Sequence, residues 1–339
     1  MIATVDAAEP LRATIELENN RSNVVFLVKA NEKGILWQYT PDNPASTTTE
    51  LADIVNIEFD DPEGWVEAVS LYRVGKYADA AVALGKIADD YVDIATLEGS
   101  PAATARYLQI ESYRKGGMYG ELAAVLTEDT QAALTNALDE SLHLQIELDA
   151  GWAAVGKANW EAVNALLAEN SEDGHIKDMA PRYLTQLTFM RGMSRSAAGE
   201  TQPAIDDFYR TATFGYGNDV EVSGQAIRRV MDLLLAQPEA LETNRTRLRQ
   251  LHAVTYLYKW MFGSGSVPER FEQYAEILPA TEGEQEAASD DSGDDSPGGA
   301  MDDGTTPPAG DDADSTTGTG EETPDSEGGE SEGDAPAQG

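Results

Sequence analysis

The segment Trp65–Leu84, with the sequence WVEAVSLYRVGKYADAAVAL, decides the fold. Apolar and small residues recur at helical spacing in two runs, one on either side of Gly75. A glycine can adopt the left-handed backbone conformation that a tight turn between two helices requires, and Tyr77 follows two residues later. The segment therefore predicts two helices joined by a short turn, with the aromatic ring packed between them.

The same arrangement recurs three times along the chain. The later turns are Gly117-Met118-Tyr119, Ala158-Asn159-Trp160 and Gly199-Glu200-Thr201, and successive starts, counted from Gly75, lie 42, 41 and 41 residues apart. One helix pair cannot bury its own apolar face, so the repeat predicts pairs that stack into a solenoid. Tyr77 and Tyr119 are expected to be buried wedges between the paired helices.

The first unit carries Ala68, Leu71, Gly75, Tyr77, Ala80 and Leu84, and this pattern resembles the tetratricopeptide repeat (TPR) family over roughly residues 62 to 216. The family's period is about 34 residues, so the period of 41–42 here implies longer helices or loops. The closing proline of the family is also missing. The resemblance implies that the first helix of each pair lines a groove that binds peptides. In this register the groove residues are Tyr72, Arg73, Tyr107, Arg114, Lys115, Trp152 and Met193.

The flanking segments have different patterns. Residues 1–61 contain four runs rich in Val, Ile and aromatic residues, LRATIELE, NVVFLVKA, GILWQYT and DIVNIEFD, which predict a small β module. Residues 40–50 are expected to form a polar loop between the third and fourth runs. Residues 62–280 form the predicted TPR-like solenoid with C-terminal capping helices. Residues 281–339 hold 19 acidic residues and no Lys or Arg, a composition typical of a disordered tail.

A local excess of positive charge follows the repeats. Seven Lys or Arg and four acidic residues lie between Arg228 and Arg270, in a chain whose formal net charge is −38. We expect a basic island at Arg228, Arg229, Arg245, Arg247 and Arg249. The acidic tail is long enough to reach the helix around Arg245–Arg249, which suggests an intramolecular contact. Salt bridges between the island and acidic residues of the solenoid are the alternative.

Composition limits the classes of function. The excess of 61 Asp and Glu over 23 Lys and Arg argues against binding to nucleic acid. The absence of cysteine excludes disulfides and thiolate metal sites, and no stretch is apolar enough to predict a transmembrane helix. The start MIATVDAAEP lacks the basic and apolar regions of a signal peptide. A cytoplasmic location is the default expectation, and export after removal of a leader is the alternative.

The sequence shows no set of residues for catalysis. His143, His175 and His252 are scattered without a partner at metal-ligand spacing, and nucleotide-binding and hydrolase motifs are missing. We therefore expect a protein that is not an enzyme and needs no cofactor. The leading hypothesis is a scaffold or adaptor that binds a protein or peptide in the solenoid groove, where the cations favour a segment carrying carboxylates. The alternative is a cell-envelope or assembly component in which the β module docks and the solenoid acts as a spacer.

Overall fold

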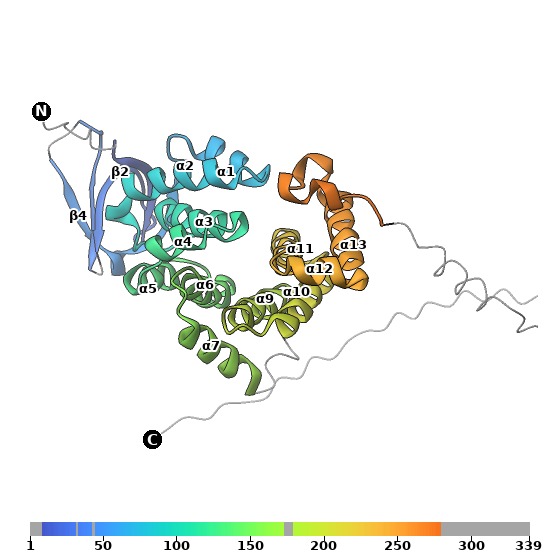
Figure 1. Cartoon of the computed structure of the whole chain (residues 1–339). Helices are drawn as coiled ribbons and strands as arrows, with labels where there is room; N and C mark the ends of the chain where they lie inside the picture. Colours follow the sequence, from blue (N-terminus) through green and yellow to red (C-terminus); the bar gives the residue numbers. More distant parts are fainter. Residues whose placement is uncertain (1–8, 32, 43–44, 173–178, 279–339) are drawn as a thin grey trace, which may run out of the picture. The chain divides into compact units, whose positions relative to one another are not determined.

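The computed structural model describes residues 9–31, 33–42, 45–172 and 179–278. Within these ranges, it describes only the backbone of Ser171, Glu172 and residues 238–240. The described residues all belong to one unit, Met1–Pro279, and the predicted acidic tail over residues 281–339 lies outside the described residues. Of the unit that is described, the N-terminal part is a β-sheet and the remainder is helical (Figure 1).

The sheet has five antiparallel strands in the order β4-β3-β2-β1-β5. The strands are β1 (Leu11–Leu17), β2 (Ser22–Asn31), β3 (Gly34–Gln38), β4 (Thr47–Glu50) and β5 (Ile54–Phe59). Buried and exposed residues alternate along β1, as expected for a strand with one face in a core. That face, with Ala13 and Ile15, packs against Ile94 and Leu97 from the helical part of the unit. The sheet thus shares its core with the helices.

Strand β4 corrects the prediction of a polar loop over residues 40–50. Residues Thr47–Glu50 pair with β3 in the antiparallel register Trp37↔Thr47 to Gly34↔Glu50. Three consecutive threonines favour extended backbone, and the indole N–H of Trp37 donates to the hydroxyl of Thr49 over 2.9 Å. The polar composition of this short edge strand hid it from a search for apolar runs.

The described residues after the sheet are mainly helical. The described helices are α1 (Trp65–Arg73), α2 (Tyr77–Asp90), α3 (Pro101–Gly116), α4 (Tyr119–Val125), α5 (Glu128–Ala137), α6 (His143–Gly156), α7 (Trp160–Glu172), α9 (Pro181–Ala197), α10 (Thr201–Gly215), α11 (Val220–Leu235), α12 (Pro238–Thr243) and α13 (Arg245–Phe262). Short 3-10 turns lie at Leu51–Asp53, Val92–Ile94, Glu140–Leu142, Ser264–Ser266 and Glu269–Tyr274. Each of the four predicted turns joins two of these helices.

All four turns begin with the same backbone conformation. Gly75, Gly117 and Gly199 have φ of 77°, 71° and 79°, and Ala158 has φ of 51°. This conformation lets the chain reverse after the first helix of each pair, and at Ala158 it places a Cβ where an L-residue is strained. The repeated geometry explains why a sequence pattern of small residues marked the helix pairs.

Because Ala158 adopts this strained conformation, Ala158→Gly should raise the free energy of unfolding by about 1 kcal/mol. Urea denaturation of both proteins measures the change. Ala198→Gly is the matched control, because Ala198 follows α9 as its C-cap with φ of −75° and gains nothing from a glycine. If Ala158→Gly lost as much stability as the control, the claim that Ala158 is strained would be wrong.

The two predicted wedges differ in burial. Tyr119 is buried, 8% exposed, and its ring stacks on Trp152 with centroids 4.9 Å apart. Tyr77 is only half-buried, and its hydroxyl donates to the carboxylate of Glu221 in α11. The expectation of a buried wedge therefore needs correction at Tyr77, which contacts a helix far along the chain as well as its own pair.

Helix α11 also contacts both helices of the second pair, α3 and α4. The side-chain amide of Gln225 donates to the backbone carbonyl of Lys115 over 2.8 Å and accepts from the hydroxyl of Tyr119. These bonds join the end of α3 and the start of α4 to a helix more than 100 residues later. Figure 1 shows α11 and α3 with no intervening labelled helix. Helix α11, which follows the four helix pairs in the sequence, is therefore packed against α3 and α4.

Candidate functional site

A polar pocket of about 510 Å³ lies where the first helices of the pairs face the start of α11. We call it the inner-face pocket. It is lined from α1, α3, α6 and α9 and from the segment that joins α10 to α11, by Tyr72, Tyr107, Glu111, Arg114, Lys115, Gln145, Arg182, Gln186, Gly217, Asn218, Asp219, Val220 and Glu221. Every helix in this set except α11 is the first of its pair. The first helices of four pairs thus contribute side chains to one pocket.

One wall of the pocket is a buried ion network. Arg114 is 3% exposed, and its Nε and Nη2 donate to the two carboxylate oxygens of Glu111 over 2.6 and 2.8 Å. Its Nη1 donates to Asp219 over 2.8 Å. Burial lowers the pKa of Arg114, but the two carboxylates outweigh this and hold that pKa above its ordinary value. Arg114 is therefore a charged structural link between α3 and the start of α11.

A second layer of polar side chains lies beside this network. Gln145 and Gln186 exchange amide hydrogen bonds of 2.9 and 3.1 Å, and the indole N–H of Trp152 donates to Gln186 over 2.7 Å. Gln145 also donates to Asp149 over 2.9 Å. Burial of Asp149, followed by the negative charge of Glu111, raises the pKa of that carboxyl well above its ordinary value. The layer satisfies buried polar groups and favours a protonated Asp149.

Two cations face the pocket with donors to spare. The ammonium of Lys115 lies 5.0 Å from the ring centroid of Tyr72, and the guanidinium of Arg182 lies over the ring of Tyr183 at 4.5 Å and donates to its hydroxyl. Among the described residues, no carboxylate lies within ion-pair distance of Lys115 or Arg182. The acidic residues of the pocket are already engaged, because Glu111 and Asp219 accept from Arg114 and Glu221 accepts from Tyr77.

The predicted groove residues are only partly brought together. Tyr72, Tyr107, Arg114 and Lys115 line the inner-face pocket. Trp152 lies behind its wall, 0% exposed, between Tyr119 and Phe189. Met193 packs half-buried against the main core, and Arg73 is exposed at the end of α1, so neither is part of the pocket lining.

The predicted basic island is divided between two helices. Arg228 and Arg229 on α11 line a depression that also includes Asp232 and Arg270. Arg270 forms an ion pair with Asp232, and Arg228 lies 6.0 Å from the ring of Tyr258. Arg245, Arg247 and Arg249 lie in the first turns of α13, and none of them lines that depression. The suggested contact with the acidic tail falls outside the described residues.

Several lining residues were not selected from the sequence. Arg182, Gln145 and Gln186 are on first helices of pairs, so the same register could have selected them. The segment Gly217–Glu221 was interpreted only as turn chemistry around its glycines. Asp219 both accepts from the backbone N–H of Val222 at the start of α11 and bonds Arg114, and nothing local in the sequence indicates the second role.

No protein-family model, curated protein or solved structure matches the chain. Within the described ranges, no group of three or more His, Asp or Glu side chains is arranged to hold a metal ion. A search of the same residues finds no helix with the length and apolar character needed to cross a membrane.

Proposed function

We propose that the helix pairs form a TPR-like stack and that the protein is a non-catalytic scaffold, which holds an acidic segment of a partner protein in the inner-face pocket. The observation that carries the proposal is the pair of cations, Lys115 and Arg182, that face the pocket without a carboxylate partner. Carboxylates that enter the pocket would gain charge-assisted hydrogen bonds from these cations.

The surrounding charges make this a selective site. Lys115 is half-buried and Arg182 is exposed, in a chain that has 61 acidic and 23 basic residues. Glu111, Asp219 and Glu221 accept from protein donors, and among the described residues none of them forms an ion pair with Lys115 or Arg182. The acidic exterior repels an anionic partner elsewhere, which directs it to this pocket.

The rim of the pocket favours a protein segment over a small molecule. Val220 lines the pocket with 42% of its surface exposed. Phe214 and Tyr216 lie shortly before the lining segment Gly217–Glu221 in the chain and are 67% and 50% exposed, although neither lines the pocket itself. Aromatic side chains are enriched at protein interfaces, where they supply anchoring area around polar contacts. A partner segment can use both the cations and this apolar rim.

The test is a selection of binding peptides from a random displayed library with the full chain as bait. We expect enriched peptides to carry Asp or Glu beside an apolar residue. Lys115→Gln with Arg182→Gln should weaken the best peptide on the order of tenfold or more, since each lost charged hydrogen bond contributes about 1.5–3 kcal/mol. The control Lys86→Gln removes an exposed lysine that pairs with Asp90 on α2 and should change nothing. Equal binding by all three proteins would refute the site.

A second candidate is docking through the β module, and the outward face of the sheet favours it. Val24 and Val28 on β2 are 46% and 36% exposed there, and Val55 on β5 is 67% exposed. The same selection separates the two functions. Peptides that lose affinity on Val24→Lys with Val28→Lys, but not on the changes at Lys115 and Arg182, would assign binding to the sheet.

A further inference from the structure

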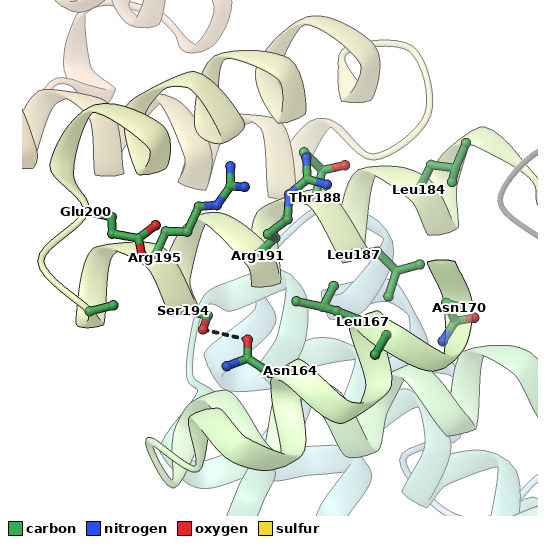
Figure 2. A pocket seen from close by; sticks show the side chains of 12 residues that line it. Asn164, Leu167, Asn170, Leu184, Leu187, Thr188, Arg191, Ser194, Arg195 and Glu200 are labelled. Carbon is green, nitrogen blue, oxygen red and sulfur yellow. Dashed lines mark hydrogen bonds between the residues drawn. The ribbon is translucent and has the colours of Figure 1, made fainter. Parts of the chain in front are cut away.

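A second pocket, of about 540 Å³, lies between α7 and α9, away from the inner face. Figure 2 shows its lining: Arg191 and Arg195 leave α9 on one side, and Leu167 and Leu187 meet between the two helices. We call it the α7–α9 groove. It shares no lining residue with the inner-face pocket.

The cationic end of the groove is held in place by one buried acid. Asp207 on α10 is fully buried and accepts from Arg191 Nε and Nη2 over 3.0 and 2.8 Å, and from Arg195 Nη1 over 2.8 Å. The arginine side chains are themselves 39% and 38% exposed. Two guanidinium groups therefore share a single carboxylate, and each keeps N–H donors that none of these bonds uses.

Asp207 and Glu200 together balance the two arginines in formal charge, but Glu200 does not occupy the guanidinium donors that remain. Glu200 is the other charged lining residue, and among the described residues it forms no ion pair with Arg191 or Arg195. Two pre-oriented guanidinium groups are a preferred partner for a carboxylate, because their planar donor arrays match its two oxygens. The unoccupied N–H donors at this end thus fit an acidic side chain.

The other end of the groove is apolar and lies close by. Leu187 forms its buried floor, and Leu167 and Leu184 are half-buried beside it. Leu187 and Arg191 are four residues apart on α9, which places them about 6 Å apart along the helix axis. In an extended peptide, side chains two residues apart point the same way and lie about 6.7 Å apart. A peptide with an apolar and an acidic side chain two residues apart could therefore place one at Leu187 and the other at Arg191.

The length of the groove indicates a peptide. Its lining on α9 runs from Leu184 to Ala198, about 21 Å of helix. An extended chain covers that distance with about six residues. We infer that the α7–α9 groove is a second binding site, which takes an extended segment of a partner protein with an apolar residue and Asp or Glu two positions apart.

The probes are fluorescein-labelled nine-residue peptides of Gly and Ser with one Leu and one Glu, spaced two apart in either order, read by fluorescence anisotropy with the full chain. A peptide of the same composition with Leu and Glu adjacent is the reference, since its two side chains point to opposite faces of an extended chain. We expect at least one spaced peptide to bind about fivefold or more tighter than the adjacent peptide. Equal affinities for all three peptides would overturn the inference.

Two variants locate the binding. Arg191→Gln removes a cation but leaves Arg195 bonded to the buried Asp207. Thr188→Glu, one turn before Arg191, adds a carboxylate to the groove and leaves Arg191, Arg195 and Asp207 in the sequence. Both should weaken the spaced peptide about tenfold or more. The control Thr213→Glu, on the exposed side of α10, should not change its affinity. Unchanged binding in Thr188→Glu, with the helical circular dichroism of the parent, would refute the site. Loss in Lys115→Gln with Arg182→Gln instead would assign the peptide to the inner-face pocket.

Discussion

Replacement of Trp152 by alanine should lower the free energy of unfolding by about 3–5 kcal/mol, the range for emptying a large aromatic site in a core. Trp152 is fully buried, stacks on Tyr119 and lies 5.3 Å from the ring of Phe189. Its indole N–H is also the donor to Gln186, so the change leaves a cavity and removes a buried hydrogen bond. Chemical denaturation measures the loss.

The matched control is Trp260→Ala. Trp260 lies on α13 with 68% of its surface exposed, so its removal should change stability by less than about 0.5 kcal/mol. Equal losses in the two variants would contradict the position of Trp152 in the core. If instead Trp152→Ala kept full stability and only reduced peptide binding, the residue would belong to the binding surface that the family register assigned to it.

Removal of Arg114 should destabilise the fold by about 3–5 kcal/mol, because it would leave the buried carboxylates of Glu111 and Asp219 without a counter-charge. The expected variant is Arg114→Ala, measured by urea denaturation at neutral pH. Adding Glu111→Gln should recover part of the loss, since it removes one of the two uncompensated charges.

Arg12→Ala is the control for Arg114→Ala. Arg12 pairs with Asp60 at the surface, where both side chains are about half exposed, so its loss should cost less than about 1 kcal/mol. A loss for Arg114→Ala no larger than this would show that the network between α3 and α11 does not form. Arg114 and Trp152 are therefore poor positions for testing binding, because their replacement changes the stability of the unit.

The helix pairs could be predicted because their signals are local. A small residue at each turn, followed in the first two pairs by Tyr77 and Tyr119, marks the place where the chain reverses. The turns begin where this pattern predicted them. Strand β4 could not, because its pairing with β3 is stabilised by Thr hydroxyls and backbone bonds without an apolar run.

The site could be predicted only up to the helix face. The register taken from the family resemblance assigned Tyr72, Tyr107, Lys115 and Trp152 to a groove, but it does not say what covers that face. Contacts such as Arg114 with Asp219 and Tyr77 with Glu221 join residues 105 and 144 positions apart. These long-range contacts determine which side chains are buried and which line the pocket. The periodicity of the sequence does not predict them.

The most direct test of the proposed scaffold function is a charge exchange at the inner-face pocket. The measurement is the dissociation constant of the best selected acidic peptide, by isothermal titration calorimetry, for the parent chain and for Lys115→Glu with Arg182→Glu. We expect the variant to bind the acidic peptide about 100-fold or more weakly, and to recover binding when Asp and Glu of the peptide are replaced by Lys. Unchanged affinity for the acidic peptide, in a variant that keeps the parent's helical content, would contradict the account.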